Sequence, residues 1–271
     1  MNYPQRLLAH LARYRREALG ISEPGVFRHR GNDLLIEHIL PKERAWLGVP
    51  VEKREMVHSF CTEQSVKLHR YFHHLNSSQA FALSLFVPFF QGDTTSSSSL
   101  LRALGVEGTL VSWYPEYVPD TSEGTNHDAW WRTSSGAQYF CEVKLTESKF
   151  GVAANDGAHR RKLEVIYTPR LQGHIKPQRL EQAQFFAAYQ ILRQLWHAAG
   201  SDASYAMFLY PRQREDLTDI IIPVLEDITS PLRDRVVTIH AEDVLARVIA
   251  DASCPEHLRE YARRLADKYL L

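Results

Sequence analysis

The sequence has few cysteines and no long apolar run, and each absence excludes a class of protein. Its three cysteines lack C-x-x-C spacing, which argues against a disulfide framework and against a structural zinc site. No stretch approaches the roughly 18 apolar residues of a membrane span. The N-terminal segment MNYPQRLLAHLARYRREALG has neither the apolar core nor the cleavage site of a secretory signal. We therefore expect a soluble, cytoplasmic protein.

An excess of positive charge is also missing. Lys plus Arg and Asp plus Glu number 32 each, so any contact with nucleic acid must come from a local patch. There is no G-x-S-x-G, no H-E-x-x-H and no glycine-rich phosphate loop. Serine hydrolases, zinc proteases and P-loop NTPases therefore have no support.

The length of 271 residues and the 44% hydrophobic content allow one large core or two modest ones. We expect a single elaborated domain over residues 1–271. Its predicted parts are an N-terminal helical and loop extension over 1–60, a catalytic core over 61–250 and a C-terminal helix over 251–271.

The most informative stretch runs from residue 126 to residue 146 and reads NHDAWWRTSSGAQYFCEVKLT. Strand-forming residues, including Trp130 and Trp131, flank a cluster of turn-forming residues, which predicts a β-hairpin. A turn centred near Ser135 places Asp128 opposite Glu142, because facing residues then have numbers that sum to about twice 135.

Alternation along the second strand puts Glu142 and Lys144 on the same face, towards Asp128. Two carboxylates can hold a hydrated Mg²⁺, which polarises a phosphate and lowers the pKa of a bound water. The lysine can orient that water or stabilise developing negative charge. The alternative is an ordinary salt-bridged hairpin with no catalytic role. Glu116, near the end of an expected strand over 109–117, is either a further metal ligand or a surface glutamate.

An Asp followed by a short hairpin and a Glu-Val-Lys strand resembles the PD-(D/E)XK nuclease signature. The segments LNSSQAFALSLFVPFF, EGTNHDAWW and FCEVKLTESKFG are similar to bacterial restriction endonucleases of that superfamily. The resemblance implies a restriction-endonuclease-like fold, double-stranded DNA as substrate, and Mg²⁺ as cofactor with Mn²⁺ as a substitute. It assigns catalysis to Asp128, Glu142 and Lys144. One departure is His127, which stands where the superfamily commonly has Pro.

The same resemblance suggests supporting residues on two helices. Gln79 lies in the first turn of an apolar helix expected over 79–86, where superfamily members often lend a polar residue to the metal site. Satisfying nearby backbone groups is the alternative role for Gln79. Gln190 falls near the middle of a helix expected over 177–199, where polar residues often support the site.

One strongly basic segment runs over residues 149–179 and includes Arg160, Arg161 and Lys162. Because it follows the Glu142 strand, we expect it to lie beside the active-site face and to contact DNA phosphates. The alternative is a solvated loop whose charge has no function.

The remaining pattern predicts an α/β fold, a mixed sheet with helices on both faces and a helical N-terminal extension. Residues 21–55 read as loops with one brief element at the apolar run Leu34 to Ile36, and residues 91–101 read as a loop. The expected helices cover residues 1–20, 62–75, 241 onwards and 255–271, and the expected strands cover 205–211, 219–225 and 236–240.

The first functional hypothesis is a Mg²⁺-dependent DNA endonuclease of restriction or phage-defence type. A repair or recombination nuclease of the same fold and a non-catalytic nucleic-acid or protein-binding module remain alternatives. Cutting both strands of a duplex with one active site per chain is most simply done by a twofold pair, so we expect a homodimer.

Overall fold

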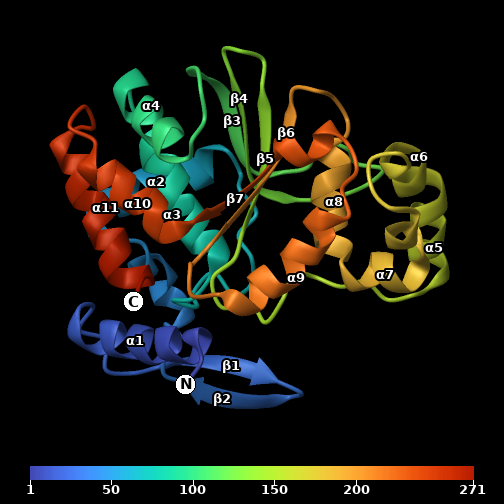
Figure 1. Ribbon diagram of the computed structural model, residues 1–271. Coiled ribbons are helices and arrows are strands. Elements are labelled where there is room, and N and C mark those ends of the chain that lie inside the picture. The colour runs from blue at the N-terminus through green and yellow to red at the C-terminus, as the bar shows by residue number, and fades with distance from the viewer. The chain divides into compact units, whose positions relative to one another are not determined.

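A computed structural model describes residues 1–271 (Figure 1). The chain forms two compact units, each assembled from segments that are distant in sequence. Unit 1 comprises Met1–Leu110, Val143–Thr146 and His240–Leu271, and unit 2 comprises Val111–Glu142 and Glu147–Ile239.

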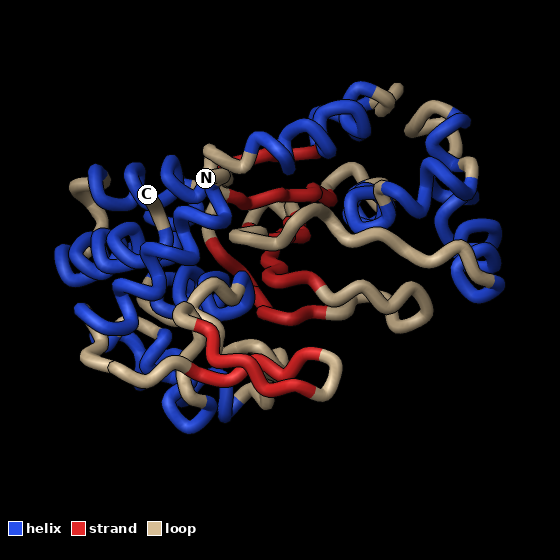
Figure 2. The backbone as a smooth tube through the Cα atoms, turned by 90° about the horizontal axis from the view of Figure 1, so that it is seen from below, coloured by secondary structure: helices blue, strands red, loops and turns tan.

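Unit 1 is mainly helical and carries one separate two-stranded hairpin (Figure 2). Its elements are α1 (Tyr3–Glu17), β1 (Gly25–His29), β2 (Asn32–Ile36), the 3₁₀ helix η1 (Lys42–Gly48), α2 (Val51–Glu63), α3 (Ser78–Phe90), α4 (Thr94–Ala103), α10 (Ala241–Ala250) and α11 (Glu256–Tyr269). The predicted helices at both chain ends are thereby confirmed.

The core of unit 1 is built around α3, whose residues Gln79 to Phe90 are all buried. The helix begins where the sequence predicts, because the Ser77 side chain accepts a hydrogen bond from the Ala80 N–H at 3.2 Å. It continues through Pro88, although proline cannot donate to the carbonyl of Ser84. The hydroxyl of Tyr261 in α11 donates to that carbonyl instead, at 2.9 Å, which removes the cost of an unsatisfied buried acceptor.

Unit 2 contains a mixed five-stranded sheet in the order β3-β4-β5-β6-β7, flanked by helices. Its elements are β3 (Leu110–Tyr117), β4 (His127–Thr133), β5 (Gln138–Val143), α5 (Gly157–Lys162), the π-helical turn η2 (Leu163–Tyr167), α6 (Thr168–Leu171), η3 (Pro177–Leu180), α7 (Gln182–Ala187), α8 (Tyr189–Ala198), β6 (Ser204–Tyr210), α9 (Glu215–Glu226), η4 (Pro231–Arg235) and β7 (Val236–His240). The expected α/β class is confirmed.

The predicted hairpin is present as β4 and β5, and its register is the expected one. Trp130 pairs with Phe140 and Trp131 with Tyr139, so the numbers of facing residues sum to twice 135. The reversal is closed by the Thr133 N–H, which donates to the Ala137 carbonyl at 2.9 Å. Gly136 has a φ of +85°, a left-handed conformation that glycine adopts without strain.

Two expected irregular or extended segments are helices instead. Residues 94–103 form α4, because the Asp93 carboxylate accepts from the N–H of Ser96 at 2.8 Å and so initiates a helix in a serine-rich stretch. Residues 219–225 belong to α9, whose buried side chains recur at helical spacing. They are Leu217, Ile221, Val224 and Leu225.

Other boundaries are also corrected. The expected helix over 62–75 is wrong, since α2 already ends at Glu63 and Ser65 has a φ of +51°. The brief element expected at Leu34 to Ile36 lies in β2, while the expected loops around it contain β1, η1 and the start of α2. The helix expected over 177–199 is divided into η3, α7 and α8, with a break at Ala188. None of the helices is both long enough and apolar enough to cross a membrane.

Candidate active site

Asp128 and Glu142 lie on neighbouring strands of unit 2. The register pairs Ala129 with Cys141, so one step along the ladder brings Asp128 opposite Glu142. Glu142 is 4% exposed and Asp128 is half-buried. Burial raises the pKa of the Cys141 thiol well above its usual value, and the charges of Asp128 and Glu142 raise it further. Both carboxylates are therefore close to Cys141, which itself stays protonated.

Two glutamine amides of α8 hold the Glu142 carboxylate. Gln190 Nε2 donates to Oε1 at 2.6 Å, and Gln194 Nε2 donates to Oε2 at 3.1 Å. The Gln190 Oε1 in turn accepts from the Gly151 N–H at 2.7 Å, which fixes the orientation of that amide. The structure thus places the predicted Gln190 directly beside Glu142. The sequence reasoning missed Gln194, although its i, i+4 spacing from Gln190 puts both on one helix face.

Lys144 follows Glu142 by two residues but lies beyond the end of β5. It belongs to the segment Val143–Thr146 of unit 1, where its side chain is 8% exposed. The same segment is anchored within unit 1 by the Asn76 side chain, which donates to the Thr146 hydroxyl at 2.6 Å.

Glu116 lies near the end of β3, the strand beside β4. Its carboxylate accepts a hydrogen bond from the side chain of Asn126, two residues before Asp128. The backbone φ of Glu116 is +49°, a conformation that a non-glycine residue adopts only at some cost. Glu116 is therefore held near the beginning of the strand that carries Asp128.

The chemistry of these carboxylates fits a magnesium ion. The structure holds no group of three or more His, Cys, Asp or Glu side chains placed to bind one metal ion. Protein-bound Mg²⁺ usually takes one or two carboxylates and completes its shell with waters and substrate phosphates. Asp128 and Glu142 supply two carboxylates, and Gln190 and Gln194 fix the orientation of the Glu142 carboxylate.

The other predicted residues are placed as follows. The Gln79 amide accepts from the His69 N–H at 2.7 Å and donates to the Lys67 carbonyl at 3.0 Å, which favours the backbone-satisfying alternative. Arg160 and Arg161 in α5 are exposed. Lys162 is half-buried, and its ammonium donates to the Glu123 carbonyl at 2.7 Å.

Glu123 is a fully buried acid that the sequence reasoning missed. Its Oε1 accepts from the Tyr167 hydroxyl at 2.6 Å and from Arg193 Nε at 2.7 Å. Its Oε2 accepts from the Thr125 N–H at 2.7 Å and contacts His197 Nε2 at 3.1 Å. The only sequence signal was its position in EGTNHDAWW, just before the hairpin.

Burial alone would raise the pKa of Glu123. The hydrogen bond to His197 and the charge of Arg193 outweigh burial and hold this pKa well below its usual range. Arg193 and His197 lie on α8, the helix that also carries Gln190 and Gln194. Their contacts with Glu123 therefore fix the helix that positions Glu142. His127 is buried beside His197 and Phe140, and its ring centroid lies 4.4 Å and 4.9 Å from theirs, respectively.

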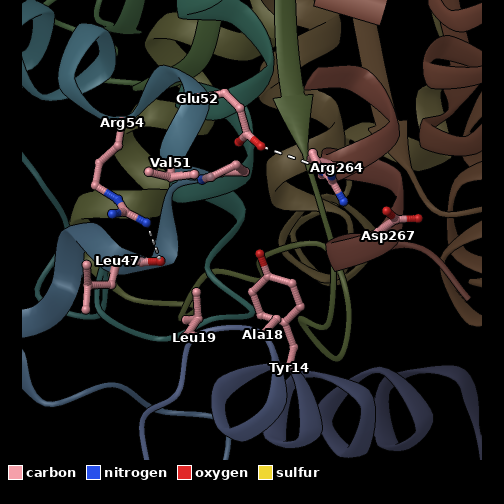
Figure 3. A pocket seen from close by; sticks show the side chains of 10 residues that line it. Tyr14, Ala18, Leu19, Leu47, Val51, Glu52, Arg54, Arg264 and Asp267 are labelled. Carbon is pink, nitrogen blue, oxygen red and sulfur yellow. Dashed lines mark hydrogen bonds and ion pairs between the residues drawn. The ribbon is translucent and has the colours of Figure 1, made fainter. Parts of the chain in front are cut away.

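Unit 1 contains separate hollows. Figure 3 shows one of about 500 Å³, into which the Tyr14 hydroxyl points. Glu52 lies 3.6 Å from Arg264 across it, and Arg54 donates to the Leu47 carbonyl at 3.4 Å. These charged groups thus pair with each other or with the backbone.

The comparison with known proteins gives one result. The model of a family described as Restriction Endonuclease associating with ARP matches residues 8–270. Neither a curated protein nor a solved structure matches the chain.

Proposed function

Because this chain belongs to the family of restriction endonucleases associating with ARP, we propose that it is a Mg²⁺-dependent endonuclease that hydrolyses phosphodiester bonds of double-stranded DNA. The family supports a nuclease that binds DNA. The observation that carries the finer proposal is the hairpin register, which sets Asp128 opposite Glu142. Mn²⁺, which accepts the same oxygen ligands, is expected to substitute.

Each residue has a defined part in this proposal. Asp128 and Glu142 would hold the ion, and Gln190 and Gln194 orient the Glu142 carboxylate through their amide N–H groups. When bound, the ion supplies polarisation of the scissile phosphate and a water of lowered pKa. Lys144 orients the attacking water or stabilises the charge that develops on the phosphoryl oxygens.

The arginines of α5 complete the proposal. Arg160 and Arg161 are exposed and follow an N-terminal cap made by Asp156. The Arg160 side chain makes only one long internal hydrogen bond, from its Nε to the Asp156 carbonyl at 3.4 Å, and exposed cations of this kind can neutralise phosphates. Lys162, which bonds to the Glu123 carbonyl, is assigned instead to holding α5 in place.

The deciding experiment compares the parent protein with Glu142→Ala and Lys144→Ala. We expect Glu142→Ala to abolish Mg²⁺-dependent nicking of supercoiled, unmethylated plasmid and to weaken Mg²⁺ binding in calorimetry, because it removes a metal ligand. Lys144→Ala should lose turnover but largely retain Mg²⁺ binding, because its role concerns the water or the transition state.

Gln178→Ala is the matched control, since Gln178 is exposed in unit 2. It should nick like the parent. If Glu142→Ala and Lys144→Ala also nick like the parent and both melt at lower temperature irrespective of Mg²⁺, the hairpin is a salt-bridged scaffold and the proposal fails.

A further inference from the structure

A second cavity of about 650 Å³ lies in unit 1, between β1, the first turn of η1 and the turn formed by residues 69–74. The backbone brings these segments together. The Leu40 N–H donates to the His73 carbonyl at 3.1 Å, and the Gly25 N–H donates to the Ile39 carbonyl at 2.7 Å. A Cβ at Gly25 would collide with the Leu40 carbonyl, so this approach requires glycine.

One wall of the cavity is aromatic. The Tyr71 ring lies 5.7 Å from Phe27 and 4.8 Å from His74, and Phe27 lies 5.9 Å from His74, all between ring centroids. The Arg70 guanidinium stands 4.5 Å from the Tyr71 ring centroid. The three rings are tilted from one another by 33° to 75°, so a flat, π-rich ligand can stack on one ring and contact the edges of the others.

A buried polar atom lies beside that wall. His73 lines the cavity and is only 5% exposed, and its Nε2 has no hydrogen-bond partner. Burial lowers the pKa of His73, although hydrogen bonds to the Arg70 and Val26 carbonyls act to raise it. The ring is therefore neutral, and its Nε2 can donate or accept one hydrogen bond. A buried polar atom without a partner costs free energy, and a ligand group that bonded to Nε2 would remove that cost.

The charges around the cavity are balanced. Three cations and three acids line it, namely Arg28, Lys42, Arg70, Glu23, Asp33 and Glu43. A balanced lining favours a neutral ligand that carries both donors and acceptors over a free anion. Cations at the edge can still contact phosphates next to such a ligand.

We propose that this cavity receives one unpaired nucleobase of the DNA, an inference that rests on the proposed function. The flat face of the base stacks on one ring of the wall formed by Phe27, Tyr71 and His74, and the edge of the base bonds to His73 Nε2. Nucleobases combine a π face with donors and acceptors at the edge, and a base outside the duplex stack exposes both.

The test uses a duplex carrying one unpaired 2-aminopurine, a matched duplex without it, and the free 2-aminopurine deoxyriboside, all in EDTA so that no cleavage occurs. We expect the parent to quench 2-aminopurine fluorescence and to bind the duplex with the unpaired base about 5- to 150-fold more tightly than the matched one, the range for stacking one base on an aromatic wall. Tyr71→Ala and His73→Phe should both reduce this preference.

The control is Tyr114→Ala, which removes a half-exposed aromatic ring of unit 2 and should keep the preference. His73→Phe keeps an aromatic ring at this position and removes both ring nitrogens, and thermal melting of the variant checks that it is still folded.

Equal affinity of the parent for the two duplexes overturns the inference. So does binding of the free deoxyriboside without a preference for the unpaired base in DNA, which would make the cavity a small-molecule site. Plasmid nicking with Mg²⁺ by a parent that shows no such preference refutes the inference alone and leaves the proposed function standing.

Discussion

At the scale of single residues, the buried Glu123 carboxylate makes stability depend on pH. The pKa of Glu123 is lower in the folded than in the unfolded protein. The carboxylate therefore adds its full contribution to the free energy of unfolding above the ordinary carboxyl pKa near 4.5, and this contribution is lost as pH falls through the folded-state pKa. Glu123→Gln should therefore cost about 3 kcal/mol of unfolding free energy at pH 7, because it leaves Arg193 without its buried partner.

The difference between Glu123→Gln and the parent should shrink as pH is lowered below about 4.5, where the unfolded carboxylate binds a proton. Urea unfolding at several pH values measures it. Glu164→Gln, an exposed acid of the adjacent π-helical turn, is the control and should show no such dependence. A constant difference across the range would show that charge is not what Glu123 contributes.

The sequence could indicate the site only in part. Asp128 and Glu142 could be placed opposite each other because a hairpin's register follows from its turn. Glu123 could not be found, since its partners Tyr167, Arg193 and His197 are brought to it by tertiary packing far from it in sequence. The spacing of Gln194 from Gln190 could have placed both on one helix face. Which face of α8 contacts the sheet, however, depends on tertiary packing.

At the scale of elements, the turn of the β4–β5 hairpin depends on one backbone conformation. Gly136→Ala should destabilise the protein by about 1 to 2 kcal/mol, because the left-handed φ of +85° is strained for any residue with a Cβ. Nothing lies within 4 Å of the added methyl group, so the cost is conformational rather than steric.

Gly157→Ala provides the comparison. Gly157 opens α5 without a positive φ and also has open space around its Cβ position, so alanine there should be neutral or stabilising. Thermal melting of both variants measures the contrast. Equal effects would mean that the turn tolerates a different conformation.

The elements predicted correctly are those whose local and tertiary signals agree. The hairpin, α1, α3 and α11 combine clear periodicity with turn or cap residues. In α9 the β-branched run Ile220, Ile221 and Ile222 favours a strand, and Pro223 disfavours a helix. The segment is nevertheless helical, because its buried residues recur every three or four positions from Leu217. In α4 the serines suggest a loop until Asp93 caps them.

At the scale of the whole molecule, DNA binding should depend on salt through α5. Replacing Arg160 and Arg161 together by Ala should lower the slope of log affinity against log salt by about 1.8, or 0.9 for each lost phosphate contact. Fluorescence anisotropy with a matched duplex over a range of salt measures the slope. Arg233→Ala, an exposed cation of η4, should leave it unchanged. If the slope of the double variant equals that of the parent, Arg160 and Arg161 do not contact DNA phosphates.

Assembly is the second expectation at this scale. The proposed function gives each chain one active site, which would cut one strand at a time, so cleavage of both strands is most simply done by two chains related by a twofold axis. Sedimentation with uncut duplex in EDTA should show two chains of 31.2 kDa for each DNA. A single chain on the DNA, and a single chain without it, would refute the dimer.

The division of the chain between its units has a consequence for biosynthesis. Unit 1 combines Met1–Leu110 with His240–Leu271. The carbonyl of Ser84 in α3 accepts a hydrogen bond from the Tyr261 hydroxyl, and the carbonyl of Ala103 accepts one from Arg247. On the ribosome the N-terminal helices therefore emerge long before their partners are synthesised. Unit 1 cannot close until α10 and α11 have been synthesised, and a chain terminated before them leaves the apolar surface of α3 uncovered for chaperones and proteases to recognise.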